Sequence, residues 1–485
     1  MSGAAFSDAG TAMRWRAIQL AGVQGIYFLR LLVLARLLAP DAFGFVAIAM
    51  LAVGIVARVT DLGMIPALVQ RGQATKAEYD AAWTVGLLRA LAIALVLAAF
   101  AEPVAALFGE EQAAPVVRAL AWRPVIEAAA SIGIVRLTQE LRFRRLAMIA
   151  LPAAIVDFGV AVATARALGV WALVAGSLAG SATTLCLSYA LAPHAPRLSL
   201  RFEAIRPLIH FGRWVLATGL VALAGTTLTQ LAVSRLEGAA ALGLYFLAWR
   251  VAFMPVDAVS AVVSAVAFPM FARLRDDTRE TAATFRRLLT GEAVTLLPAY
   301  ALVFALAPAL EAALGGRWEG TAPVIRILSV AAVTGILGEL VGPLLMGRGR
   351  ADRSFRLELV QTGVLLLVLY PLVACLGARG AALAWLAGNV AALVVTMAWL
   401  GSLVPGGIAL PAGPMLAAFG AGTAAAGAAL VCSEAFDPLA GVLAGAASGL
   451  GAAAIVLFGL ERGFNLGLTD LARWVRGAGH DNRAP

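Results

Sequence analysis

Long apolar runs, broken only by short polar segments, follow one another along almost the whole chain. A helix rises 1.5 Å per residue, so a run of about 20 apolar residues can cross the hydrocarbon core of a bilayer. The pattern predicts fourteen such helices, at residues 14–39, 42–70, 81–108, 115–138, 144–166, 170–192, 208–235, 241–272, 287–314, 321–346, 354–376, 380–401, 411–432 and 438–460. Because these spans leave only short loops, we expect an all-α polytopic membrane protein without an extramembrane domain.

The chain also repeats itself at a nearly constant spacing. ARLLAPDAFGFVAIA, from Ala35, matches SRLEGAAALGLYFLA, from Ser234, and APVVRALA, from Ala114, matches APVIRILS, from Ala322. A weaker match sets GVWALVAG beside GAALAWLAG. The repeat unit holds six predicted helices, and an even number gives both copies the same orientation, related by an axis along the membrane normal. Two such lobes normally enclose a path that opens alternately to each side, which favours a transporter.

The repeat divides the chain into four parts. We expect an N-terminal lobe at 1–207, a C-terminal lobe at 208–403, two additional helices within 404–460 and a tail at 461–485. Apolar residues alternate with arginines along the tail, which predicts a short amphipathic helix on the cytoplasmic membrane surface.

Basic residues are distributed unequally between the two sides of the predicted membrane. The side that holds the N-terminus carries most of the basic loop residues, whereas the opposite loops hold only Arg166, Arg235, Arg317 and Arg379. Loops rich in arginine and lysine stay in the cytoplasm. We therefore expect both termini to be cytoplasmic.

Composition agrees with a membrane protein and limits its chemistry. Hydrophobic residues make up 61% of the chain and charged residues 13%, with a mean hydropathy of +0.90. The net charge of +9 does not indicate a nucleic-acid partner, because the arginines are dispersed between apolar spans. The three cysteines and three histidines show no metal-ligand or catalytic spacing, so we expect no enzyme, no metal and no other cofactor.

Charged residues inside apolar spans are the candidate functional residues. Arg30 and Arg36 lie in the span 14–39, and Arg58 and Asp61, three residues apart on one helix face, lie in the span 42–70. An ionisable residue inside a membrane is costly unless it faces a partner or water. The arrangement indicates either a polar cavity or mutual neutralisation between packed helices.

Other charged residues in or beside the predicted spans have alternative interpretations. Arg123 and Glu127 are four residues apart, which predicts a pair within one helix. Arg89 and Asp157 are buried in the predicted spans, where each can line a cavity of the first lobe or pair across helices. Arg36 repeats at Arg235 beside a predicted turn, which favours a structural role at a helix end.

Several ordered phrases across residues 12–400 resemble one known family. They include ARLLAPDAFG, DLGMIPALVQR, QELRFRRLA, RFEAIRPLIHFGRW, FPMFARLRDD and GGRWEGTAPVIRIL. The chain resembles Wzx-like flippases of lipid-linked oligosaccharides, a branch of the multidrug/oligosaccharidyl-lipid/polysaccharide exporter superfamily. The resemblance implies twelve to fourteen helices in two six-helix lobes, which agrees with the repeat.

The resemblance also implies a function and a site. The implied substrate is an oligosaccharide on an undecaprenyl-diphosphate carrier, moved across the bacterial inner membrane for polysaccharide biosynthesis. Membrane lipids, and the polysaccharide polymerase and export machinery, are the implied partners. A central cavity lined by basic residues places Arg30, Arg58 and Arg250 as substrate contacts, with Asp61 and Asp257 holding the arginines in place. Arginine suits a diphosphate because its guanidinium binds oxyanions bidentately.

Two other functions compete with this interpretation. A cation-coupled exporter of small molecules or drugs with the same fold would need an acidic ion site, for which Asp157 is a candidate. A membrane polymerase or ligase would need a large outer loop with catalytic residues, and the predicted outer loops are only a few residues long.

Overall fold

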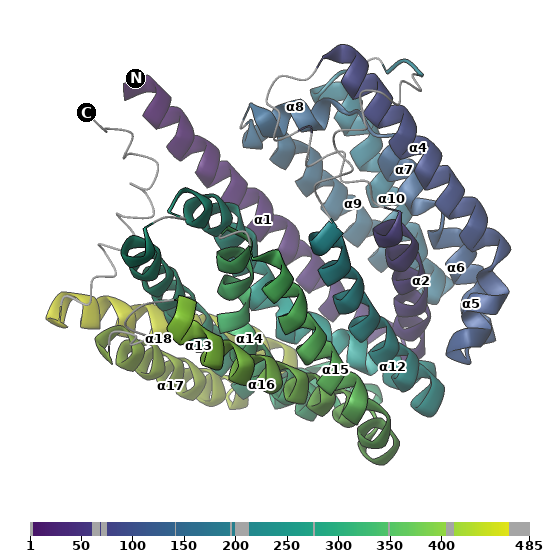
Figure 1. Ribbon diagram of the computed structural model, residues 1–485. Coiled ribbons are helices and arrows are strands. Elements are labelled where there is room, and N and C mark those ends of the chain that lie inside the picture. Colours follow the sequence, from purple (N-terminus) through teal and green to yellow (C-terminus); the bar gives the residue numbers. More distant parts are fainter. Residues whose placement is uncertain are drawn as a thin grey trace. The chain divides into compact units, whose positions relative to one another are not determined.

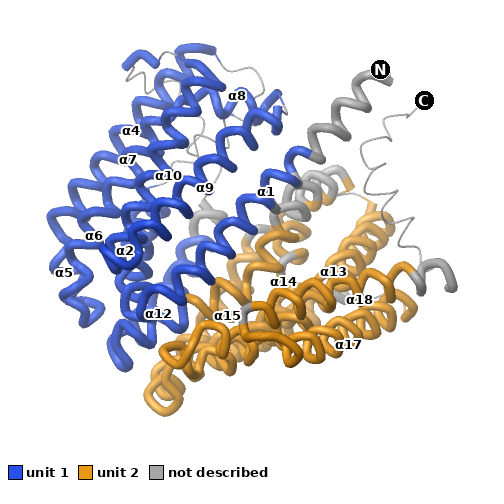
Figure 2. The backbone as a smooth tube through the Cα atoms, turned by 180° about the vertical axis from the view of Figure 1, so that it is seen from behind, with its two compact units in different colours: residues 1–246 blue, residues 247–485 orange. Residues whose placement is uncertain are grey.

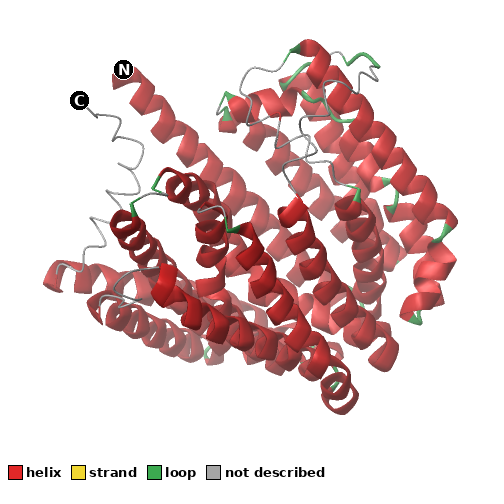
Figure 3. Cartoon of the chain, viewed as in Figure 1, coloured by secondary structure: helices red, strands yellow, loops and turns green. Residues whose placement is uncertain are grey.

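The structure is a computed structural model in which every described regular element is a helix (Figures 1 and 3). It describes residues 3–60, 68, 75–140, 142–194, 196–198, 213–274, 277–347, 350–403 and 412–464. Within these ranges there is no strand, which confirms the predicted all-α class.

The chain forms two compact units, residues 1–246 and residues 247–485 (Figure 2). The described helices of unit 1 are α1 (Gly3–Leu37), α2 (Pro40–Val59), α4 (Lys76–Ala99), α5 (Ala101–Phe108), η1 (Glu111–Ala113), α6 (Ala114–Leu120), α7 (Arg123–Ala128), α8 (Gly133–Gln139), α9 (Phe143–Leu168), α10 (Val170–Leu191) and the first part of α12 (Arg213–Arg273). Within this unit α9 packs against both α1 and α10.

Unit 2 contains the remainder of α12 and all later helices. They are α13 (Thr278–Leu314), η3 (Gly316–Trp318), α14 (Thr321–Gly347), α15 (Ala351–Leu376), α16 (Ala378–Leu403), α17 (Ala412–Glu434) and α18 (Pro438–Phe464). Here α16 packs against α14 and α15, and α13 packs against α14, α17 and α18. The predicted lobe boundary at 207/208 and the tail after residue 464 lie outside the described residues, so the four-part division stays a prediction.

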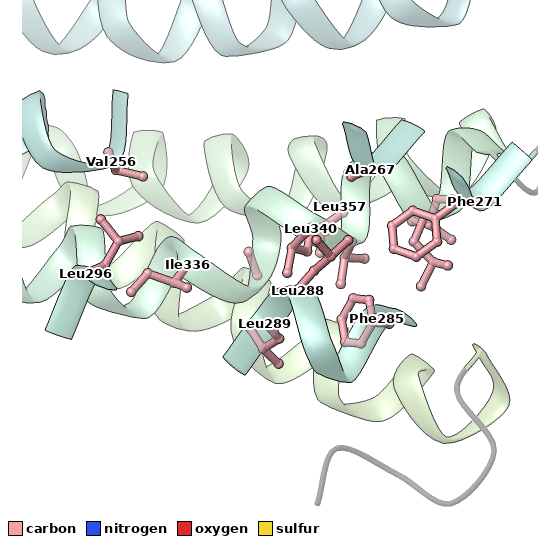
Figure 4. Packing of buried hydrophobic residues seen from close by; sticks show 14 of the residues in the cluster. Val256, Ala267, Phe271, Phe285, Leu288, Leu289, Leu296, Ile336, Leu340 and Leu357 are labelled. Atoms are coloured by element: carbon pink, nitrogen blue, oxygen red, sulfur yellow. The ribbon is translucent and has the colours of Figure 1, made fainter. Parts of the chain in front are cut away.

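A buried apolar cluster holds the helices of unit 2 together (Figure 4). Phe271 of α12 and Phe285 of α13 are fully buried, with ring centroids 6.3 Å apart. Leu340 of α14 and Leu357 of α15 belong to the same cluster. Ala392 of α16 also belongs to it, so side chains from five helices meet in one core.

Twelve helices among the described residues are long and apolar enough to cross a membrane, which makes the chain a multi-pass membrane protein. One of them, Thr218–Ser260, covers two predicted spans in a single stretch of 43 residues. The predicted span 115–138 is not among the twelve. The predicted count of fourteen membrane helices therefore stays a prediction.

The predicted single helix at 115–138 is wrong, because the structure has the three short helices α6, α7 and α8 there. Pro124 lies in the first turn of α7, where its missing N–H is tolerated, but it cannot continue α6. Before α8, the Ser131 hydroxyl accepts from Gly133 N at 3.2 Å and donates to the Ala192 carbonyl at 2.5 Å. The hydrogen bond to Gly133 N is a local alternative to a continuous helix.

Gly238 divides α12 at the position that matches the turn between α1 and α2 in the repeat. Its φ of 84° and ψ of 179° interrupt the helix, and in the repeat it aligns with Ala39, the residue before α2. Glycine adopts this positive φ without the steric cost of a Cβ. The long α12 is therefore the counterpart of α1 and α2 together.

The two matched segments also contact each other reciprocally within unit 1. A Cβ on Gly44 would overlap the Ala239 carbonyl, and a Cβ on Gly243 would overlap the Pro40 carbonyl. In the repeat, Pro40 aligns with Ala239 and Gly44 aligns with Gly243. The contact of Gly44 with Ala239 is therefore the repeat equivalent of the contact of Gly243 with Pro40. This exchange of contacts is what a two-fold relation produces.

Candidate functional site

Arg30 and Asp157 form an ion pair between α1 and α9. Arg30 Nε lies 2.9 Å from Asp157 Oδ1, and the two side chains are 19% and 8% exposed. Arg30 Nη2 also donates to the Leu173 carbonyl of α10 at 3.4 Å. Of the two predicted alternatives for Asp157, the structure shows pairing across helices.

Glycines of α10 make room for this carboxylate. A Cβ on Gly176 would lie 2.7 Å from Asp157 Oδ1, and one on Gly180 would lie 2.9 Å from Asp157 Cβ. Small residues permit close helix approach in membrane proteins. The charge pair is therefore enclosed by three helices, α1, α9 and α10.

A second polar group extends this cluster to α7. Arg123 Nε lies 2.8 Å from Glu127 Oε1, the pair within one helix that the spacing predicts. Ser181 of α10 donates to the same Glu127 oxygen at 3.3 Å. Arg123 also acts electrostatically on Asp157. Two arginines and two carboxylates thus balance each other among the apolar helices of unit 1.

Arg58 and Arg89 lie near the end of α2. Arg58 is exposed in the last turn of α2, where a cation also complements the helix dipole. Arg89 Nη1 of α4 donates at 3.2 Å to the carbonyl of Thr60, which follows α2 directly. Arg36 is exposed in the last turn of α1, at a helix end as predicted. Asp61, the expected partner of Arg58, lies outside the described residues.

Arg250 and Asp257 are exposed on α12 in unit 2. Their spacing of seven residues places them on one side of the helix, and Arg250 acts electrostatically on Asp257. The neighbouring face of α12 is aromatic: Trp249 stacks on Phe253 with ring centroids 4.0 Å apart. Unit 2 therefore has its own basic residue beside an aromatic surface.

Sequence reasoning missed two polar contacts in unit 1. His194 Nε2 lies 2.8 Å from Asp80 Oδ1, and the two side chains are 4% and 8% exposed. The Ala239 N–H donates to Glu110 Oε1 at 2.5 Å, which caps the second half of α12. In both cases the partners lie more than one hundred residues apart in the sequence. Helical spacing predicts contacts only between residues three or four apart, so it could not identify these pairs.

In the described part of the chain, no three His, Cys, Asp or Glu side chains are grouped as ligands for a metal ion. Ion pairs are found instead, among them Arg30 with Asp157 and His194 with Asp80.

Comparison with known proteins identifies relatives of this chain. Residues 33–323 match the family described as "Polysaccharide biosynthesis protein". The lipopolysaccharide biosynthesis protein WzxC of Escherichia coli (strain K12) is 24% identical over 356 residues, which cover 72% of each chain. The succinoglycan biosynthesis transport protein ExoT of Rhizobium meliloti (strain 1021) is 27% identical over 322 residues, or 65% of each chain.

Solved structures share the fold at low identity. The lipid II flippase MurJ in an inward closed conformation has a TM-score of 0.71 and 12% identity, covering 92% of this chain and 98% of its own. An inward-facing multidrug resistance transporter of the MATE family, within the MOP superfamily, has a TM-score of 0.62 and 17% identity, covering 79% and 97%. Both neighbours confirm the fold that the resemblance implied.

Proposed function

Because the chain belongs to the polysaccharide biosynthesis protein family, we propose that it is a flippase for undecaprenyl-diphosphate-linked oligosaccharides. It moves the head group from the cytoplasmic to the outer leaflet of the bacterial inner membrane by alternating access. The sugar and diphosphate travel through a polar path while the polyprenyl tail remains in lipid. No covalent step is required, so the protein acts as a transporter and not as an enzyme.

Exposed arginines on apolar helices carry this proposal. Arg58 in unit 1 and Arg250 in unit 2 are both exposed, although they belong to helices long and apolar enough to span the membrane. An arginine in the hydrocarbon core costs several kcal/mol, so water is the favourable surrounding for Arg250, whereas Arg58 lies at a helix end. A diphosphate passing along the polar path offers the oxyanions that guanidinium groups bind best.

Arg30 has a different part in the same path. Its partner Asp157 holds it in place and balances its charge when no substrate is bound. Asp257 is suited to the same task for Arg250 on α12. Paired carboxylates limit repulsion between arginines in an empty cavity.

A cation-coupled drug exporter with the same fold is less well supported. That function would need a carboxylate available to a proton or metal cation, and Asp157 instead pairs with Arg30 at 2.9 Å. The named relatives that match by sequence are proteins of polysaccharide biosynthesis. Cooperation with a polysaccharide polymerase and export machinery, and cytoplasmic placement of both termini, belong to the same proposal.

The leaflet location of the lipid-linked oligosaccharide in cells tests the function. Cells that lack the gene are treated with a membrane-impermeant glycan probe and compared with cells in which the gene is restored. We expect the intermediate to accumulate on the cytoplasmic face until the gene is restored. Normal exposure of the intermediate in the deletion strain would remove the flippase assignment and make drug or ion export the leading account.

A further inference from the structure

A partly open pocket of about 230 Å³ lies entirely within unit 2, between α12, α14, α15 and α16. Pockets that hold drug-sized ligands measure roughly 300–1,000 Å³, so this one has room for a single small ring. We call it the unit 2 pocket. The side chains on which the inference rests are Phe253, Glu358, Gln361, Trp385 and Asn389.

One wall of the unit 2 pocket is aromatic and held in position. Trp249 stacks on Phe253 and also meets Trp385 edge-on, with centroids 4.7 Å apart and planes at 83°. Phe253 and Trp385 then line the pocket from α12 and α16. A pyranose ring presents a face of C–H groups, which packs well against a flat aromatic surface.

A second part of the pocket wall is polar, and its amides are oriented by hydrogen bonds. Asn389 donates to the Ala331 carbonyl of α14 at 2.7 Å and accepts from Gln361 Nε2 at 2.7 Å. With its amide nitrogen engaged in this way, Gln361 keeps the carbonyl oxygen Oε1 as an acceptor for a ligand hydroxyl. Glu358, three residues earlier on α15, adds a carboxylate.

Such a wall is unusual inside apolar helices. Buried carboxamides are costly in a membrane unless they are hydrogen-bonded, and a carboxylate there marks a functional site by default. An aromatic face together with hydrogen-bonded amides and a carboxylate matches a sugar ring, which has an apolar face and a rim of hydroxyl groups.

The unit 2 pocket also lies close to a proposed diphosphate ligand. Arg250 precedes Phe253 by three residues on α12, a rise of about 4.5 Å along the helix. At 100° per residue, Arg250 projects about 60° from Phe253 around the helix, so it flanks the aromatic wall. A sugar bonded directly to a diphosphate can therefore reach the pocket while the phosphates contact Arg250.

We propose that the unit 2 pocket is a subsite for one monosaccharide ring of the substrate, the ring attached to the diphosphate. The inference rests on the proposed flippase function. The aromatic face and the acceptor oxygen of Gln361 suit a neutral sugar or an amino sugar.

Binding to the full-length protein in lipid nanodiscs tests the subsite. The probes are undecaprenyl diphosphate without sugar and the same lipid carrying glucose, galactose, N-acetylglucosamine or glucuronic acid. We expect at least one neutral sugar to tighten binding about tenfold or more over the sugar-free lipid. Gln361→Ala abolishes this difference and leaves the affinity for the sugar-free lipid unchanged.

Matched variants separate recognition from folding. Gln112→Ala makes the same change at an exposed position of η1 in unit 1 and keeps the sugar preference. Trp385→Phe retains a smaller aromatic face and reduces the preference, whereas Trp122→Phe at an exposed position does not. Arg250→Ala weakens binding of the sugar-free and sugar-bearing lipids alike.

Three results would overturn the inference. Wild-type protein that binds sugar-free and sugar-bearing lipids equally has no sugar subsite. Equal weakening of both lipids by Gln361→Ala would assign that residue to folding. An unchanged sugar preference in Gln361→Ala and Trp385→Phe would place the sugar outside the pocket. If the wild-type protein binds none of the lipids, the proposed function itself fails. This result differs from the three results above, in each of which the wild-type protein still binds lipid.

Discussion

Arg30 and Asp157 are the clearest case of charge inside the apolar bundle of unit 1. Arg30 Nε lies 2.9 Å from Asp157 Oδ1, and α10 closes over the carboxylate through Gly176 and Gly180. Removing one partner leaves the other charge buried and unpaired, which lowers the stability of the fold more than replacing both residues with apolar ones. The pair is therefore a structural requirement as well as a candidate part of the transport path.

Asp157→Ala is expected to destabilise the protein by about 3–5 kcal/mol, because Arg30 loses its counter-ion. The double variant Arg30→Met/Asp157→Leu should recover most of that stability but not transport, since the proposed substrate-binding cation is absent. Thermal unfolding in detergent, together with the leaflet assay, measures both effects.

The exposed pair of Arg118 and Glu102 is the matched control, with side chains 46% and 59% exposed. Glu102→Ala should change stability by no more than about 1 kcal/mol. An Asp157→Ala protein that unfolds at the wild-type temperature would contradict the structural role of the pair.

Residue spacing predicted contacts within one helix but not the contacts between helices. The pair of Arg123 and Glu127 follows from a spacing of four residues. The partners of Asp157 and Asp80 could not be chosen from the sequence, because the apolar spans offered many helix faces of equal hydropathy. Only packing selects among them.

At the scale of elements, the repeat explains why α12 is so long. Gly238 corresponds to the turn between α1 and α2, and the two matched segments contact each other through Gly44 and Gly243. The sequence identified the repeat and its glycines, but low-complexity helices give no sign that the two copies touch. Helix breaks within the span 115–138 were missed because they depend on Pro124 and on hydrogen bonds of Ser131.

Gly44→Ala and Gly243→Ala are each expected to destabilise the protein by about 1–3 kcal/mol, because the new methyl group meets a backbone carbonyl that cannot rotate away. Their effects should not add, since both force the same helices apart. Unfolding temperatures of the two single variants and the double variant provide the measurement.

Gly54→Ala serves as the control on α2, where nothing lies within 4 Å of the added Cβ. It should be neutral or slightly stabilising, because alanine favours the helix. Additive losses from Gly44→Ala and Gly243→Ala would mean that the two glycines do not share one interface.

At the scale of the whole molecule, the distribution of arginines predicts which ends of the helices face the cytoplasm. In a protein without its three native cysteines, Gln112→Cys in η1 should react with a membrane-impermeant maleimide added to intact cells. Arg142→Cys, before α9, should react only after the inner membrane is permeabilised. The opposite pattern would reverse the assigned orientation and place both termini outside.

The overall class of the molecule was accessible from the sequence because hydropathy, repeat and charge asymmetry all agree. The composition of 61% hydrophobic residues leaves little choice but a helical membrane protein. The arginines of the proposed path were visible as charges in apolar spans. The unit 2 pocket was not, since Gln361 and Asn389 are uncharged and meet only when α15 and α16 pack.

Reconstituted transport tests the central claim most directly. Purified protein is placed in liposomes with an undecaprenyl-diphosphate-linked oligosaccharide, and an impermeant glycosidase reports how much of the lipid reaches the outer leaflet over time. We expect wild-type protein and Arg317→Ala, a change at an exposed residue of η3, to move the lipid. Arg58→Ala and Arg250→Ala should slow it by about tenfold or more. Transport by wild-type protein no faster than in protein-free liposomes, or full activity in both arginine variants, would contradict the account.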